Sequence, residues 1–152
     1  MYNFSDVDRW EGFIYKKYGG EDKARWLITL SVPSSLDIER KFIFCTTTTV
    51  EKPVLIQQNK FLKLNHSKYN FFFVDCYIYF NEPIFDLYEY EIKKQIEHIQ
   101  FMGRLDRDDM IQLYLGYWSH RMGSPIQLRN IKETCIRNEI AANRLPDPQK
   151  NK

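Results

Sequence analysis

The stretch KARWLITLSVPSSLDIERKFIFCTTTT, residues 23–49, decides the fold prediction. Two apolar runs, RWLITLSV and RKFIFCTTTT, lie on either side of the polar connection PSSLD. Short apolar runs bounded by turn residues are typical of strands, and about seven residues on each side of a connection bring the outer ends of an antiparallel pair together. Arg25 begins the first run and four threonines end the second, so this pairing would bring the arginine beside the threonines.

More runs of the same kind extend from Gly12 to about Phe80. They are FIYKKY, VLIQ, FLKL and NFFFVDCYIYF, and turn residues such as the pair Gly19-Gly20 separate them. The aromatic content of 16% supports this interpretation, because Phe and Tyr favour pleated, half-buried surfaces. Several short strands at close spacing predict about five or six strands in a small antiparallel barrel or sandwich.

The C-terminal half changes to a helical period, and we expect three helices there. Ile92, Ile96 and Ile99 recur at helical spacing, which predicts a helix near residues 90–102 that Gly103 ends. The whole chain therefore belongs to the α+β class, with an antiparallel β-barrel followed by about three helices.

The second and third helices have clear start signals. Asp106 can cap the free amides of a helix near residues 106–121, and the motif SPIQ forms a capping box for a helix near residues 125–143. The second helix carries apolar residues on more than one face, so we expect it to lie between the barrel and another helix. The tail LPDPQKNK has two prolines and little to bury, which predicts a loose segment over residues 144–152.

Length and charge limit the class of protein. The 152 residues suit one domain, with a barrel part over residues 11–80 and a helical part over residues 89–143. A formal net charge of +2 is too small to indicate a nucleic-acid-binding protein by itself, so any basic footprint must be local.

Cysteine usage indicates a reducing compartment. Cys45, Cys76 and Cys135 form no CxxC motif and no cluster with the three scattered histidines, so we expect buried thiols, no disulfide framework and no metal site. The charged N-terminus is not a signal peptide, and no stretch approaches the ~20 apolar residues of a membrane span. These features predict a cytoplasmic protein without a membrane partner.

The arginine and the threonines are the best candidates for chemistry. The guanidinium of Arg25 has charged, planar donors suited to a phosphate, and threonine hydroxyls can donate to phosphate oxygens. The competing interpretation is structural: threonine is a good strand former, and an arginine at a strand edge discourages aggregation. Nucleotide-binding and acyl-transfer motifs are absent from the sequence.

The order of motifs over about residues 11–80 resembles the MazF/PemK-like growth-inhibitor family. The residues that carry this resemblance are Gly12, Ile14, Tyr15, Gly19, Gly20, Arg25, Leu27, Ile28, Leu30 and Ser31, then FIFCTTTT, and later Asp75, Cys76 and Tyr77. Two features depart from the family pattern: Trp26 stands where many members have proline, and the helical part is longer than in the smallest members.

The resemblance implies an SH3-like barrel and a metal-independent endoribonuclease toxin of a bacterial type II toxin–antitoxin system. In such an enzyme the ribose 2′-OH attacks its own phosphodiester, so proton transfer and charge stabilisation are needed but no cofactor. Arg25 would stabilise the phosphorane, and Thr47 or Thr48, only one of which can face the groove, would bind the phosphate. The residues that would bind neighbouring phosphates or border the same face are Lys16, Lys17, Lys23, His66 and Lys68.

The implied partners are single-stranded RNA, an antitoxin protein and a second copy of the chain in a homodimer. Two alternatives stay open. One is a non-catalytic SH3-like module that binds a protein or a nucleic acid, because fold does not imply function. The other is a structural or regulatory partner whose helical half forms the interface.

Overall fold

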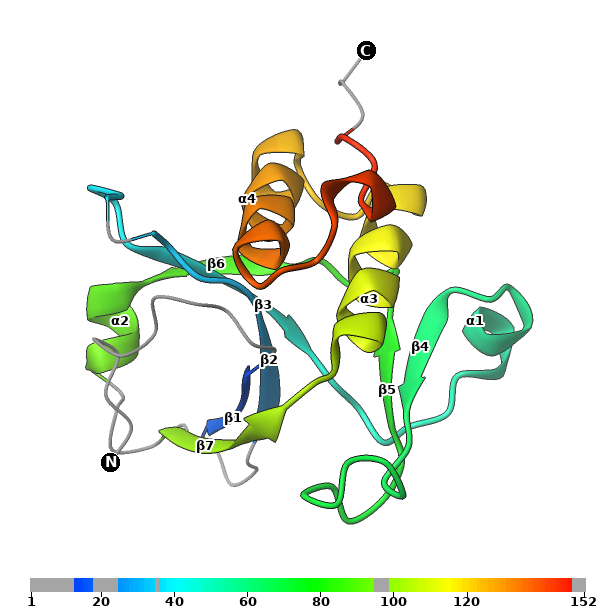
Figure 1. The fold of residues 1–152 in the computed structure, drawn as a ribbon. Coiled ribbons are helices and arrows are strands. Elements are labelled where there is room, and N and C mark those ends of the chain that lie inside the picture. The colour runs from blue at the N-terminus through cyan, green and yellow to red at the C-terminus, as the bar shows by residue number, and fades with distance from the viewer. Residues whose placement is uncertain (1–12, 18–24, 35, 95–98, 149–152) are drawn as a thin grey trace.

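The computed structural model describes residues 13–17, 25–34, 36–94 and 99–148 (Figure 1). The strands are β1 (Phe13–Lys17), β2 (Arg25–Ser31), β3 (Lys41–Thr46), β4 (Phe61–Leu64), β5 (Cys76–Tyr79), β6 (Phe85–Tyr88) and β7 (Ile99–Arg104). The helices are α1 (Pro53–Gln57), α2 (Glu89–Lys93), α3 (Arg107–Ser119) and α4 (Pro125–Arg137), followed by a 3₁₀ turn at Ala142–Arg144.

The strands form two antiparallel sheets. The larger sheet has the order β6-β3-β2-β1-β7, and β4 and β5 form a separate hairpin. The predicted pairing of β2 with β3 is confirmed, with Leu27 opposite Thr46. An isolated bridge between Thr48, two residues after β3, and Tyr77 of β5 joins the larger sheet to the β4–β5 hairpin.

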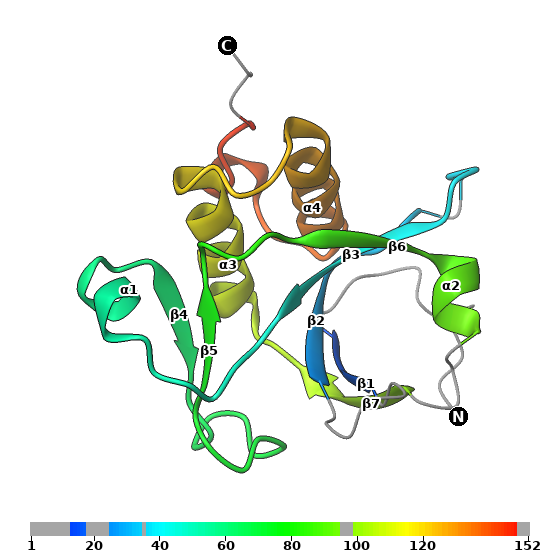
Figure 2. The same cartoon turned by 180° about the vertical axis from the view of Figure 1, so that it is seen from behind.

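The α+β class with antiparallel strands and several helices is confirmed, but a closed barrel is not shown. In the described part of the chain, β6 and β7 are the outer strands of the larger sheet and do not pair with each other. Figures 1 and 2 show the larger sheet and the β4–β5 hairpin side by side, with α3 and α4 packed against them.

The helix predicted near residues 90–102 is confirmed up to Lys93 and wrong from residue 99 onward, while residues 95–98 lie outside the described residues. Helix α2 has one turn, and residues 99–104 form β7, which pairs with β1. Gly103 does not end a helix: a Cβ atom there would lie 2.4 Å from the ring of Phe71, so the glycine lets that ring approach the strand. Pairing with β1 therefore overrides a helical spacing of isoleucines.

The starts of the other two helices are confirmed. The Asp106 carboxylate accepts a hydrogen bond from the Asp109 N–H (2.8 Å). Ser124 and Gln127 form the reciprocal capping box at α4, with distances of 3.1 and 3.0 Å. Helix α3 contacts both α4 and β4, as its two apolar faces predicted.

The chain after α4 is packed against the helices rather than loose from residue 144. Leu145 is buried, the Trp118 Nε1–H donates to the Asp147 carbonyl (2.8 Å), and the Lys132 ammonium lies 2.7 Å from the Asp147 carboxylate. The Tyr114 hydroxyl also donates to the Pro146 carbonyl, so several contacts hold residues 145–147 against the helices. Residues 149–152 of the expected tail lie outside the described residues.

The three cysteines are free and buried, as predicted. Burial raises the pKa of both Cys45 and Cys135 to about 12 and that of Cys76 to about 11, so the thiols stay protonated at neutral pH. Among the described residues, no three His, Cys, Asp or Glu side chains gather as metal ligands would. A membrane-crossing helix is likewise absent from the described part of the chain, where every helix is too short or too polar.

Candidate functional site

The backbone of β2 and β3 brings Arg25 and the threonines together. Beyond the Leu27–Thr46 pair, the Thr47 N–H donates to the Trp26 carbonyl (3.3 Å), so the register continues by at least one residue. Arg25 and Thr48 each lie one residue beyond this hydrogen-bonded pair, past the last registered pair of β2 and β3. The predicted contact with a phosphate involves the Arg25 side chain, whose position lies outside what the structure describes.

Thr48 is the point where the two sheets meet. Its N–H donates to the Tyr77 carbonyl (2.9 Å), and its carbonyl accepts from the Tyr77 N–H (2.7 Å). Successive residues of a strand direct their backbone groups to opposite sides. The Thr47 backbone therefore bonds to β2 and the Thr48 backbone to β5. The four threonines at positions 46–49, called the threonine row below, thus lie in the seam between the two sheets.

Two of the threonine hydroxyls have partners. The Thr46 Oγ1 donates to the Glu82 carboxylate (3.2 Å), whose other oxygen accepts from the Lys52 ammonium (3.0 Å). The Thr48 Oγ1 accepts from the Val50 N–H (3.1 Å), which leaves its own proton able to donate to a ligand. Thr46 and Thr48 are two residues apart, so they share one face of the strand.

Charged and aromatic groups of the following turn border the row. The Lys52 N–H donates to the Tyr79 hydroxyl (2.8 Å), and the Lys52 ammonium lies 5.0 Å from the centre of the Tyr79 ring. The Tyr77 hydroxyl donates to the Glu51 carboxylate (3.0 Å). The row therefore has a cation and two carboxylates beside it, and a phosphate bound there would depend on Arg25 and Lys52 to offset them.

Lys16 and Lys17 lie on the strand next to Arg25. Their Cα atoms pair with those of Trp26 and Arg25, respectively, and their side chains lie outside what the structure describes. Lys23 is outside the described residues. The backbone thus brings two of the predicted phosphate-binding lysines to the strand beside the candidate site.

His66 lies in the β4–β5 loop and is tied to Asp75. The Asp75 Oδ1 accepts from the His66 N–H (2.9 Å) and lies 3.0 Å from the ring Nδ1, and Lys63 approaches Oδ2 at 3.5 Å. The His66 N–H first, and then the Lys63 charge, hold the pKa of Asp75 below its usual range. The His66 ring is half exposed, so it can still meet a ligand at the rim of the loop.

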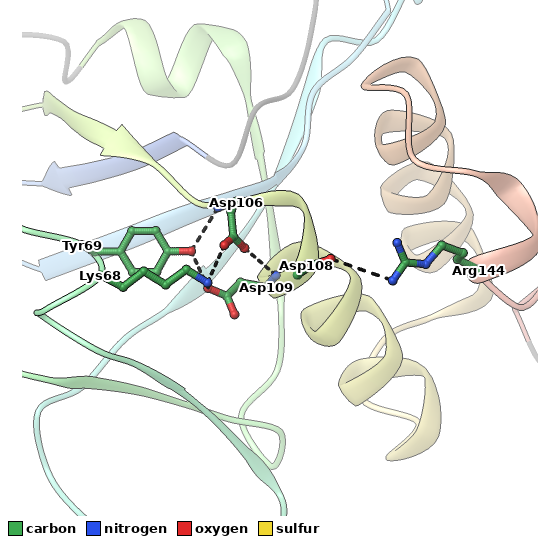
Figure 3. A network of polar contacts seen from close by, with 6 residues as sticks. All are labelled: Lys68, Tyr69, Asp106, Asp108, Asp109 and Arg144. Atoms are coloured by element: carbon green, nitrogen blue, oxygen red, sulfur yellow. Dashed lines mark hydrogen bonds and ion pairs between the residues drawn. The ribbon is translucent and has the colours of Figure 1, made fainter.

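Lys68 has a structural partner at the start of α3. Its ammonium contacts the carboxylates of Asp106 and Asp109, the latter at 3.1 Å, and the hydrogen bond to Asp106 raises the pKa of Lys68 (Figure 3). The Tyr69 hydroxyl joins the same network by donating to Asp109 and accepting from the Asp106 N–H (3.0 Å). Binding a phosphate would require Lys68 to leave these carboxylates, so its clearest role is to attach the loop to α3.

Sequence reasoning missed Glu82 and Lys52 as neighbours of the threonine row. Glu82 is 36 residues from Thr46, and no periodicity pairs positions so far apart. Lys52 follows the threonines closely, and that proximity was the available signal.

Comparisons of the chain with models of protein families, with curated proteins and with solved structures find no match. We therefore infer what the site can bind and catalyse from its own side chains. A hydroxyl with a free proton, a lysine, a carboxylate and the start of β2 meet at one seam, which suits binding of a phosphodiester and transfer of a proton.

Proposed function

We propose that the protein is a metal-independent endoribonuclease that cleaves single-stranded RNA at the seam between β3 and β5. The observation that supports this proposal is the antiparallel pairing of β2 with β3. The Thr47 N–H bonds to the carbonyl of Trp26, the residue next to Arg25. An arginine and a threonine hydroxyl opposite each other can stabilise the negative charge that develops on a phosphorane.

The proposed reaction needs no metal or cofactor. The ribose 2′-oxygen gives up its proton and forms a bond to phosphorus, the bond from phosphorus to the 5′-oxygen breaks, and the 5′-oxygen takes a proton from solvent, so the products are a cyclic phosphate and a free 5′-hydroxyl. Arg25 cannot take the 2′ proton, because its guanidinium stays protonated at neutral pH and offers no lone pair to accept a proton. We therefore assign that step to the Glu82 carboxylate, which is bonded to Thr46 (3.2 Å), and leave charge stabilisation to Arg25 and Thr48.

Thr48 is preferred over Thr47 as the phosphate-binding threonine. It shares a strand face with Thr46 and hence with Glu82, and its hydroxyl proton is free to donate because the oxygen acts as an acceptor for Val50 N–H. Thr47 faces the other way by strand alternation.

Membership of the MazF/PemK-like family and an SH3-like barrel are part of the proposal. Support for the barrel comes from β3, which pairs within the larger sheet and then bridges to β5 through Thr48. Strands that switch sheets form the corners of small β-barrels and orthogonal sandwiches. The proposed setting is the bacterial cytoplasm, with an acidic antitoxin over the seam and a second copy of the chain as a dimer partner.

Incubating the purified chain with a mixed single-stranded RNA in EDTA tests the function. We expect cleavage that leaves cyclic phosphate ends, and we expect Arg25→Ala to abolish it while the melting temperature stays nearly unchanged. Arg107→Ala is the matched control, because Arg107 is an exposed arginine paired with exposed Glu139 (3.2 Å). Absence of cleavage by the parent chain, or full activity of Arg25→Ala, would favour the non-catalytic binding module.

Coexpression with genes encoded beside this one tests the partner. We expect a growth defect when the chain is produced alone and rescue by a small acidic protein that copurifies with it. Size-exclusion chromatography with light scattering tests the dimer. A chain that neither slows growth nor recovers such a partner contradicts the toxin assignment.

A further inference from the structure

Phe73 is an aromatic side chain almost wholly in solvent. It is 90% exposed, whereas Phe72 beside it is 4% exposed, and Val74 on the other side is also exposed. A single exposed apolar residue is ordinary on a protein surface. What distinguishes Phe73 is the way its loop is held and which groups surround it.

The β4–β5 loop is fixed to three other elements. The Phe72 ring packs against Trp26 of β2, with 5.2 Å between ring centres. The Phe71 ring lies over Gly103 of β7, and Tyr69 is hydrogen-bonded at the start of α3 (Figure 3). The loop just before Phe73 is therefore held from both the sheet and the helix, which lowers the backbone entropy that ligand binding would cost.

The same contacts connect the loop that carries Phe73 to the strand that begins at Arg25. Trp26, which packs on Phe72, follows Arg25 directly and accepts the Thr47 N–H through its carbonyl. On the other side, Phe73 is four residues before Tyr77, the bridge partner of Thr48. Four residues of extended chain span at most about 14 Å, a distance that a short single strand of RNA can cover.

A lysine and a histidine are held close to Phe73 in the chain by one aspartate. Lys63 and His66 meet at Asp75, two residues after Phe73, and both side chains are about half exposed. The Asp75 carboxylate is shared between them, which leaves part of each group's hydrogen-bonding capacity for a ligand. An exposed aromatic face beside cations is the combination that single-strand binding proteins use, with a base on the ring and phosphates on the cations.

We propose that Phe73 stacks on an unpaired base of the RNA, near the phosphate bound at the threonine row. This inference rests on the proposed function, since it assigns a base-binding position to the same substrate. Stacking requires the flat π face and not only apolar bulk, because every base presents a π face and the contact tolerates any sequence. Phe73 would thus hold the strand in register without choosing the sequence.

The test measures binding of the full chain to a fluorescent single-stranded oligonucleotide with 2′-O-methyl groups, which lacks the attacking hydroxyl and stays intact. We expect Phe73→Ala to weaken binding about 5- to 150-fold, the range for loss of one stacked base. Phe73→Trp should bind at least as well as the parent, whereas Phe73→Leu should be as weak as Phe73→Ala. Ile38→Ala is the control, since Ile38 is a fully exposed apolar residue on a different loop.

A series of oligonucleotides with one abasic position each completes the test. One abasic position should weaken binding to the parent and leave binding to Phe73→Ala unchanged, which identifies the stacked nucleotide by a double-mutant cycle. Equal affinity of Phe73→Leu and the parent, or no binding of any oligonucleotide by the parent, overturns the stacking. If Arg25→Ala abolishes cleavage but Phe73→Ala binds the oligonucleotide as tightly as the parent, stacking is refuted and the endoribonuclease proposal stands. Phe73-dependent binding without cleavage supports stacking and refutes the endoribonuclease.

Discussion

Replacing Thr48 with valine removes one hydroxyl and keeps the branched shape of a strand residue. The hydroxyl accepts the Val50 N–H (3.1 Å) near the surface, so its loss should cost about 0.5–1 kcal/mol of unfolding free energy. If Thr48 also donates to the phosphate in the transition state, the cleavage rate should fall about 10²-fold. That decrease corresponds to about 2.7 kcal/mol of barrier height, which is well above the stability effect.

The assay compares three threonine variants by single-turnover RNA cleavage and by urea unfolding. Thr47→Val should be nearly silent in cleavage, because strand alternation directs it away from Thr48. Thr46→Val deletes the hydrogen bond to Glu82 (3.2 Å), so we expect a loss of about 1 kcal/mol in stability and a shift in the pH profile as the base is repositioned. A Thr48→Val enzyme with the parental rate, or a Thr47→Val enzyme with the larger defect, would refute the assignment of Thr48.

Three predictions concern the scaffold that holds the site. Gly116→Ala would place a Cβ atom 2.1 Å from the buried ring of Phe80, so urea unfolding should show a net destabilisation of about 1–2 kcal/mol after the gain in helix propensity. Leu145→Ala should cost about 2–5 kcal/mol in the same assay, because Leu145 is fully buried, and a smaller loss would contradict the packing of the C-terminal segment. Burial opposes ionisation of Asp106, but the hydrogen bond from Lys68 makes the pKa of Asp106 lower in the folded chain than in the unfolded chain. The ionised carboxylate therefore stabilises the fold above about pH 4, and this contribution is lost as the pH falls below that value. Unfolding at neutral and acidic pH should show a smaller acid loss in Lys68→Met than in the parent, and equal losses would count against this ion pair.

Features with local causes were predictable from the sequence. A cap needs only a side chain and an amide three residues later, so Asp106 and Ser124 could be identified without a structure, and both form the predicted bonds. The β2–β3 pairing is also local, because one short connection joins two apolar runs. The backbone bond from Thr47 to Trp26 follows from that pairing, and the contact predicted for the Arg25 side chain stays a prediction.

Strand β7 shows where such reasoning fails. Isoleucines at positions 92, 96 and 99 have helical spacing, but α2 ends at Lys93 and residues 99–104 pair with β1. The partner strand is more than 80 residues away in sequence, roughly the separation of Phe13 from Arg104, and no local pattern contains it. A glycine that looked like a helix stop instead accommodates the ring of Phe71.

Phe73 could not have been singled out from the sequence, although its neighbours fix its exposure. Phe71, Phe72 and Phe73 are identical residues in one run, so residue type alone predicts the same burial for all three. The Phe72 ring is buried and packs against Trp26, the Phe71 ring is partly buried over Gly103, and the Phe73 ring is left in solvent. The exposure of Phe73 thus accompanies the packing of its loop, and Trp26 links this loop to the threonines: its ring packs on Phe72 and its carbonyl accepts the Thr47 N–H. Substituting Trp26 should therefore disturb oligonucleotide binding and cleavage together, whereas Phe73→Ala should act first on binding.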